Sequence, residues 1–169
     1  MRADGTAWFT DGHGNLGAAA LSHTTALVAY KALASMTEKD SGNPLGLLDG
    51  EAKPALVYPV ALMETGEKIA GEDFYYTTND LTTKVPNPLK GKVTPVMLSL
   101  LTDTSDWYMV LNHDFWKPFA FIAPEDIQTV LADVNNSDRA REFNENIIYT
   151  HIRTALGVFF PGCVIKINN

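Results

Sequence analysis

The sequence predicts an α+β domain on three observations. A stretch with helical spacing of apolar residues follows the glycine-rich N-terminal segment, and three apolar runs of strand length lie between Asn87 and Ile122. Residues 143–169 then alternate with strand period. With 169 residues, 46% of them hydrophobic, the chain can bury roughly 70% of its unfolded surface, so we expect one domain with a real core.

The first expected element is a helix from His23 to about Thr37. Ser22 is a good N-cap, because its hydroxyl oxygen can accept a backbone N–H of the first turn. Gly42 and Pro44 stop the helix, since glycine suits a helix end and proline cannot continue one. The apolar face of this helix is formed by Leu27, Val28, Leu33 and Met36.

A short strand and a second helix come next. Residues Lys53–Pro59 read as a strand bounded by prolines, and residues from Val60 to about Ala70 as a helix that ends at Gly71. Residues 72–86 are polar with two tyrosines and are expected to form a loop or short irregular strands. The residues expected to point inward from the second helix are Leu62, Met63 and Ile69.

The stretch from Asn87 to Ile122 is expected to hold three strands. Val93–Leu101 is apolar at alternate positions on both sides, which suits a strand covered on both faces. Pro95 removes a ladder donor and implies a bulge or an unpaired side of that strand. The other two strands are Trp107–Leu111 and Phe119–Ile122.

The C-terminal part is expected to begin with a short helix over Pro124–Val134, whose first turn carries acidic residues that favour a helix N-terminus. A solvated turn follows. Phe143–Thr154 and Gly157–Ile167 then read as two long strands, joined at a tight bend over residues 155–157.

Charge and composition exclude several classes of protein. A net charge of −7 with scattered Lys and Arg argues against a duplex-binding protein, which needs a basic face. The single cysteine, Cys163, cannot form an internal disulfide, so no oxidising compartment is needed. The N-terminus lacks the apolar region of a signal peptide, and no apolar run reaches bilayer length. We expect a soluble, intracellular protein without a membrane partner.

No catalytic or metal-binding constellation stands out. His13, in an Asp-Gly-His-Gly-Asn loop, could act as a metal ligand or an acid–base group, but a loop histidine bonded to local backbone is the simpler interpretation. Ser22 and His23 point apart at a helix start, so they do not form a nucleophile–base pair. His113 and His151 match no known ligand spacing. We expect no catalytic residue, no metal and no cofactor.

Two further patterns also have structural explanations. Gly12, Gly14 and Gly17 match a dinucleotide fingerprint only superficially, because the strand that should precede it is poor. Cys163 has no basic neighbour in sequence and is expected to pack inside a strand.

The candidate subunit interface lies in a short, polar-flanked turn of the central stretch. Core packing explains most of the aromatic residues there, and Phe115 and Trp116 are the best interface candidates. Lys117, Lys90 and Lys92 are further candidates. Two lysines on an acidic chain are more often a solvated surface than a nucleic-acid contact.

The order of segments resembles the major capsid proteins of tailed bacteriophages, and more narrowly capsid subunits found fused to a prohead protease. The similarity runs from Asp4 through most of the chain. The segments that carry it are His13–Leu16, the helix that ends at Gly42–Leu45, Leu56–Pro59, Asn87-Pro88, Trp107-Tyr108, Lys117–Phe119 and the final strand pair.

This resemblance implies the Hong Kong 97-type capsid fold. Residues 1–52 would hold the N-terminal loop and the long spine helix of the peripheral domain. Residues 53–142 would form an axial domain, a mixed sheet flanked by helices, and residues 143–169 a terminal long antiparallel strand pair. Such subunits also carry an N-terminal arm and an extended loop before the spine helix. Only 21 residues precede Ser22, so we expect either a truncated or processed chain or a naturally reduced subunit.

The implied function is that of a non-enzymatic structural subunit of an icosahedral phage head, assembled in the cytoplasm of the bacterial host and found in the virion. Its partners would be copies of itself in pentamers and hexamers, DNA enclosed without sequence recognition, and a scaffold or prohead protease. One alternative is an encapsulin-like cargo shell or another phage morphogenesis protein. The other is a small hydrolase that uses the His13 loop.

Overall fold

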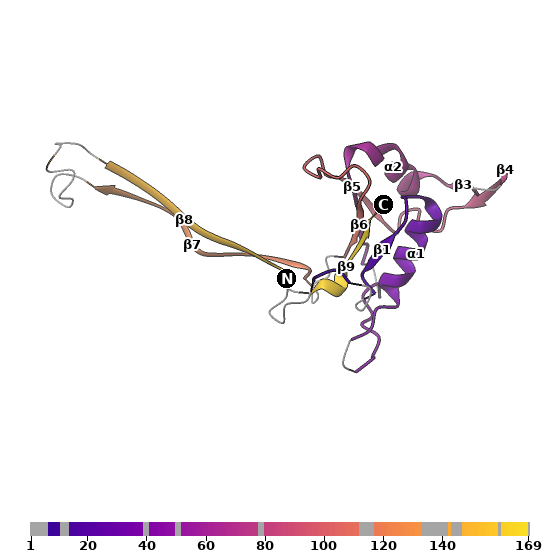
Figure 1. Ribbon diagram of the computed structural model, residues 1–169, viewed down its shortest axis with the longest axis horizontal. Helices are drawn as coiled ribbons and strands as arrows, with labels where there is room; N and C mark the ends of the chain where they lie inside the picture. The colour runs from indigo at the N-terminus through magenta and orange to yellow at the C-terminus, as the bar shows by residue number, and fades with distance from the viewer. Residues whose placement is uncertain are drawn as a thin grey trace. The chain divides into compact units, whose positions relative to one another are not determined.

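The computed structural model describes residues 7–10, 14–38, 41–49, 52–77, 80–111, 117–132, 142, 147–158 and 160–168. They form two α-helices and mostly strands, a mixed content compatible with the α+β prediction (Figure 1). The chain divides into two compact units. We call residues 1–118 with 159–169 the body, and residues 119–158 the ribbon. The expected segments 1–52, 53–142 and 143–169 stay a prediction.

The body is built on a five-stranded mixed sheet in the order β1-β9-β6-β2-β5. The central strands β9, β6 and β2 pair antiparallel, while β1 and β5 run parallel to β9 and β2 as the two edge strands. The bounds of the strands are Leu16–Ala18 for β1, Val164–Asn168 for β9, Trp107–Val110 for β6, Ala55–Tyr58 for β2 and Thr94–Met97 for β5.

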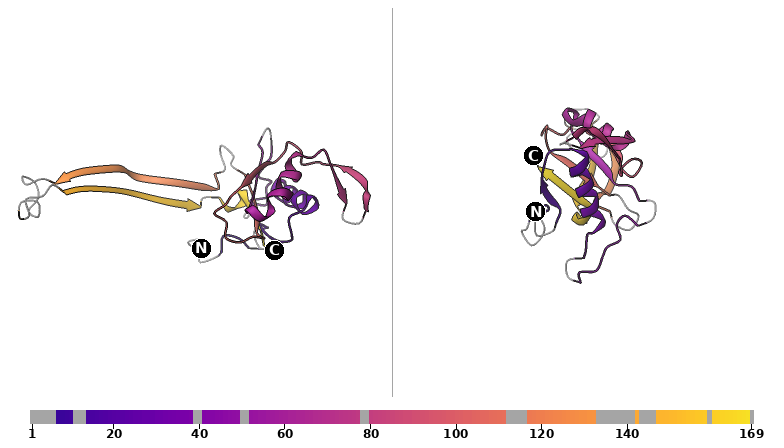
Figure 2. Two further views of the ribbon diagram at one scale, coloured as in Figure 1. Left: turned by 90° about the horizontal axis from the view of Figure 1, so that it is seen from above. Right: turned by 90° about the vertical axis from the view of Figure 1, so that its right-hand side faces the viewer.

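Helices α1 (His23–Ala34) and α2 (Met63–Gly71) pack on one face of this sheet (Figures 1 and 2). Single turns of 3-10 helix precede α2 at Val60–Leu62 and β9 at Pro161–Cys163. The core between helices and sheet contains the following buried residues: Ala26, Ala29 and Leu33 of α1, Ile69 of α2, and Leu56, Tyr58, Trp107, Met109, Ile165 and Ile167 of the sheet.

The start of α1 was predicted correctly and its end was not. Ser22 caps the helix as expected, and Thr25 completes a capping box with it. The helix ends at Ala34 instead of Thr37, because the chain turns back there to form a bridge between Thr37 and Pro44. The buried residues of α1 are Ala26, Ala29 and Leu33, whereas Val28, also expected in the apolar face, is 62% exposed.

The second helix lies where it was predicted, and Ile69 is fully buried. Met63 is exposed instead of inward, because it opens α2 just after the 3-10 turn. Residues 72–86 were expected to form a loop or short irregular strands. They contain an antiparallel hairpin of β3 (Phe74–Thr77) and β4 (Asp80–Pro86).

Strand β5 differs from its prediction in its environment. It was expected to be covered on both faces, yet it is an edge strand paired only with β2 in the described sheet. Pro95 explains why β5 lies at an edge. Its predicted effect, an unpaired side of this strand, is confirmed. Inward hydrogen bonds come from Thr94 N and Leu98 N, to Pro54 O and Tyr58 O, so Pro95 faces the open side where a missing donor costs nothing.

The ribbon consists of β7 (Phe119–Ala132) and β8 (Ile147–Val158), paired antiparallel. The helix expected over Pro124–Val134 is wrong over its described part, because residues 124–132 belong to β7, which pairs with β8. The bend expected at residues 155–157 is also wrong, since β8 continues through it. The expected terminal strand pair is therefore absent from the described residues. β8 pairs with β7, and β9 pairs with β6 and β1 in the body.

Candidate assembly surface

The ribbon has two distinguishable faces. Its register shifts at Ile122/Glu125 and again at Glu125/Gln128, each time with one extra residue on β7. Strand β8 carries no such insertion, so its even-numbered residues share one face and its odd-numbered residues the other. At about 3.3 Å per residue, the 12 residues of β8 span roughly 40 Å.

The face with the even-numbered residues of β8 is apolar, and we call it the apolar face. Thr129 lies opposite Thr150 on it, with their hydroxyl oxygens 3.4 Å apart, and no described side chain of this face is charged. Six large apolar residues of this face, exposed between 44% and 73%, are Phe119, Phe121, Leu131, Ile148, Ile152 and Leu156.

The opposite face mixes apolar and polar groups. Tyr149 and Val130 lie opposite each other in the register, both half exposed. Exposed Gln128 and the charged Arg153 lie further along the same face. The ribbon is therefore amphipathic, and its charge is confined, among described side chains, to the mixed face.

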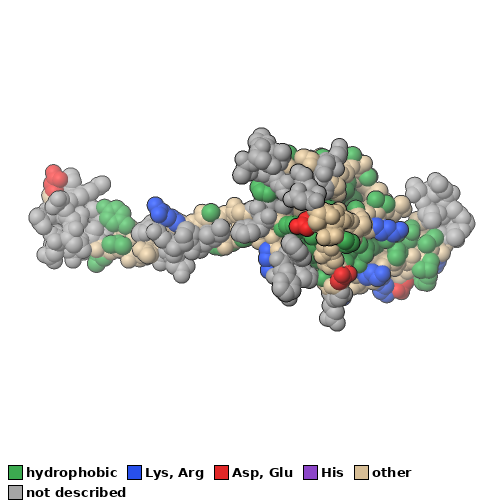
Figure 3. All heavy atoms as spheres, turned by 90° about the horizontal axis from the view of Figure 1, so that it is seen from below, with side chains coloured by type: hydrophobic (Ala, Val, Ile, Leu, Met, Phe, Trp, Pro, Cys, Tyr) green, Lys and Arg blue, Asp and Glu red, His purple; other side chains and the backbone are tan. Residues whose placement is uncertain are grey.

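An isolated two-stranded hairpin is marginal in water, because neither face can be buried by the other strand. Taking about 200 Å² for a fully exposed large apolar residue, these six residues of the apolar face present roughly 700 Å² to solvent. An exposed apolar patch of several hundred Å² is typical of an interaction site. In the view of Figure 3, hydrophobic side chains lie at the surface of the ribbon and of the β3–β4 hairpin.

The open edge of the body sheet is a second apolar surface. The segment from Val93 to Leu101 contains no charged residue, although charges commonly protect edge strands. Of the residue types that hinder pairing of an edge with another strand, charged residues and proline, this segment contains only Pro95. The exposed residues along this edge are Val96, Met97, Leu98 and Leu100.

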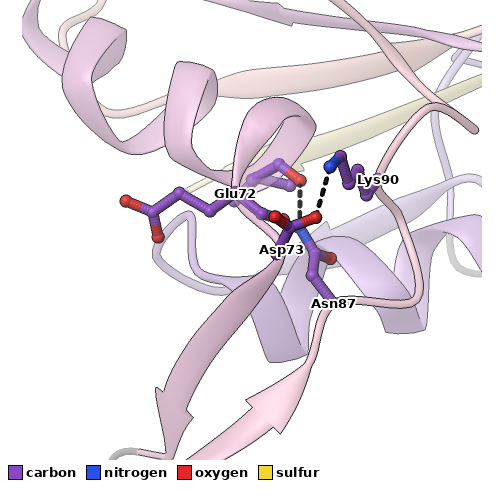
Figure 4. Close-up of polar contacts among 5 residues, drawn as sticks. Glu72, Asp73, Asn87 and Lys90 are labelled. Atoms are coloured by element: carbon purple, nitrogen blue, oxygen red, sulfur yellow. Dashed lines mark hydrogen bonds and ion pairs between the residues drawn. The ribbon is translucent and has the colours of Figure 1, made fainter.

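Several polar groups of the body have structural partners. Asn87, which is buried, donates from its side chain to Ile69 O at 2.8 Å and Glu72 O at 2.9 Å, and accepts from Leu89 N at 3.0 Å (Figure 4). It thereby satisfies a carbonyl of the last turn of α2, which has no partner within the helix. The same junction contains an exposed ion pair between Lys90 and Asp73.

A second cluster of polar side chains lies where β6 pairs with β9. The Lys166 ammonium is 3.1 Å from the Asp106 carboxylate and 5.9 Å from the centre of the Tyr108 ring. Its hydrogen bond to Asp106 raises the pKa of Lys166. Asp103 accepts from the backbone and hydroxyl of Ser105, and the backbone hydrogen bond in particular lowers the pKa of Asp103. These contacts hold a turn and do not assemble a reactive pair.

Three other titratable side chains are packed in the core or at its margin. Burial raises the pKa of Tyr58 to about 12, and its hydroxyl donates to Glu67 at 2.9 Å. Burial also raises the pKa of the Cys163 thiol to about 11, as expected for a packed residue, so the thiol is protonated at neutral pH. His23 stacks on Tyr75 with ring centres 4.6 Å apart. Burial lowers its pKa, against the opposing charge of Glu72 and a hydrogen bond to the Lys68 backbone.

The candidate interface residues from the sequence are only partly tested. Phe115 and Trp116 lie outside the described residues. Lys117 and Lys92 are exposed in the body, and Lys90 is held by Asp73.

The described residues do not test whether the histidines of the alternative hydrolase lie together. His13 and His113 lie outside the described residues, and His151 is described only as a backbone position in β8. Among the described residues, no group of three or more His, Cys, Asp or Glu side chains is placed to hold a metal ion. The described helices include none that is long and apolar enough to cross a bilayer.

Sequence reasoning missed the ribbon as the main candidate surface. The signal was present in β8, where Ile148, Ile152 and Leu156 recur on one side of an alternating pattern. Comparison with protein-family models and with curated proteins finds no match for this chain.

Proposed function

We propose that this chain is a structural subunit of an icosahedral bacteriophage head that works by binding copies of itself. The observation that carries the proposal is the ribbon, whose apolar face has no charge among its described side chains and presents roughly 700 Å² that the hairpin cannot bury by itself. A protein whose activity is assembly needs such surfaces and needs no catalytic group. The order of segments resembles that of tailed-phage capsid proteins, and this resemblance is the reason for proposing a phage head as the assembly.

In this proposal the body belongs to a Hong Kong 97-type fold, with α1 as its spine helix and the five-stranded sheet in the axial domain. Contacts between unlike surfaces of neighbouring copies close into pentamers and hexamers. The DNA is confined inside the closed shell and is not bound through sequence-specific contacts. A net charge of −7 agrees with this, because a shell need not grip the genome tightly. The subunits assemble in the bacterial cytoplasm and end in the virion, with a scaffold or prohead protease as further partners.

The test is the size of the particles that the purified chain forms. Light scattering coupled to size-exclusion chromatography gives the mass over a series of concentrations, and electron micrographs show the shape of any large fraction. Rings of five or six copies, or closed shells, are expected. A species no larger than a dimer at every concentration and ionic strength would contradict the proposal.

A further inference from the structure

We propose that the apolar face of the ribbon packs against the same face of a second copy, across a two-fold axis. This inference deepens the proposed function, because it names which surface of the neighbouring copy the ribbon meets. Two identical faces can meet only if their groups do not repel each other. The described side chains of the apolar face are aliphatic, aromatic or threonine and carry no charge, so they satisfy this condition.

The available area fits a dimer of ribbons. With roughly 700 Å² of large apolar side chains on each copy, such a contact covers roughly 1,400 Å² in total, which lies within the range of specific, stable protein interfaces. The threonines between the large residues, Thr150 and Thr154, add to this area. A single ribbon face is thus sufficient on its own, without a further surface of the body.

The geometry also fits. Two sheets pack face to face about 10 Å apart with their strands roughly aligned, and two such ribbons would give a four-stranded sandwich. The row of Ile148, Ile152 and Leu156 is spaced every four residues along β8, with the smaller threonines between them. Large residues of one copy can then lie over the small residues of the other. The mixed face with Arg153 remains on the outside.

Other occupants fit less well. A small ligand needs a concave site, and the shallow hollow found among described residues belongs to the body, where Trp8, Phe9 and Leu16 help to line it. A lipid surface would have to attract a chain of net charge −7, which anionic bilayers repel. A second copy has neither obstacle on the apolar face.

The test compares Ile152→Asp with Tyr149→Asp. These residues are 52% and 48% exposed on the same strand but on opposite faces, so both changes lower strand propensity similarly and only the first places a charge in the proposed contact. In a symmetric contact each dimer receives two buried carboxylates. We therefore expect Ile152→Asp to raise the dimer dissociation constant at least about 100-fold and Tyr149→Asp to change it by less than about threefold.

A mixing experiment distinguishes ribbon–ribbon contact from ribbon–body contact. Tagged Ile152→Asp is incubated with untagged wild-type chain, and the dimer fraction is captured through the tag. A mixed dimer carries one buried carboxylate, so much less wild-type chain should be recovered than with a tagged wild-type control. Recovery equal to that of the control would overturn the inference, since it would mean that an intact ribbon binds the body of the variant.

The outcomes separate this inference from the proposed function. Dimers that depend on Ile152, without rings or shells, would support the ribbon contact and contradict the phage-head function. Shells that form unchanged in Ile152→Asp would support the phage-head function and contradict the ribbon contact. Binding of the monomer to neutral phosphatidylcholine vesicles, lost in Ile152→Asp but with no dimer of the wild-type chain, would overturn the contact in favour of a lipid surface.

Discussion

Replacement of Asn87 by alanine tests how the β3–β4 hairpin is fastened to α2. The side chain makes three hydrogen bonds, to Ile69 O, Glu72 O and Leu89 N, at 2.8–3.0 Å in a buried position. At about 1 kcal/mol for each lost bond, the free energy of unfolding of the body should fall by roughly 3 kcal/mol. The helix carbonyl would also lose the partner that caps it.

The assay is urea unfolding followed by tryptophan fluorescence, to which Trp107, buried in the body core, contributes. Subunit concentration is held constant, because assembly adds to apparent stability. Asp73→Ala is the control. It removes the exposed ion pair with Lys90 at the same junction and should cost at most about 1 kcal/mol. A loss below about 1 kcal/mol for Asn87→Ala, or a larger loss for the control, would refute the reasoning.

Two more expectations concern the body. Gly66→Ala should destabilise it by about 1–3 kcal/mol in urea unfolding, because a Cβ there would lie 2.2 Å from the buried Tyr58 ring, whereas Gly71→Ala at the open end of the same helix should be neutral or slightly stabilising. His23 has a folded-state pKa below its unfolded value of about 6.5. The unfolded chain therefore binds more protons, and stability should fall as pH drops below about 6.5. His23→Phe, which keeps a ring over Tyr75, should reduce this slope, and equal slopes in both proteins would contradict the assignment.

Local signals predicted the elements whose ends are decided by local chemistry. Ser22 sets the start of α1 through a hydrogen bond within three residues, and Pro95 marks the open side of β5 through its own missing N–H. The end of α1 depends instead on the turn that brings Pro44 back to Thr37. Such a contact is invisible to helical periodicity.

The ribbon shows the limit of periodicity more clearly. The alternation of β8 was recognised, but alternation does not say which strand pairs with it or whether its apolar side is buried in the same chain. Pro124 and the acidic residues after it favoured a helix start, and pairing with β8 outweighed that preference. Aromatic density in the sequence favours Phe115 and Trp116 as interface residues, whereas the residues of the apolar face lie on the two following strands.

Symmetry connects the two proposals. A contact between identical faces is isologous, so by itself it stops at two copies, however strong it is. A closed shell requires in addition a contact between unlike surfaces, which makes rings. The uncharged edge of β5 is separate in sequence from the ribbon and leaves room for contacts of the second kind. Loss of the ribbon contact should then leave rings that cannot join, and this state would show that the two contacts are independent.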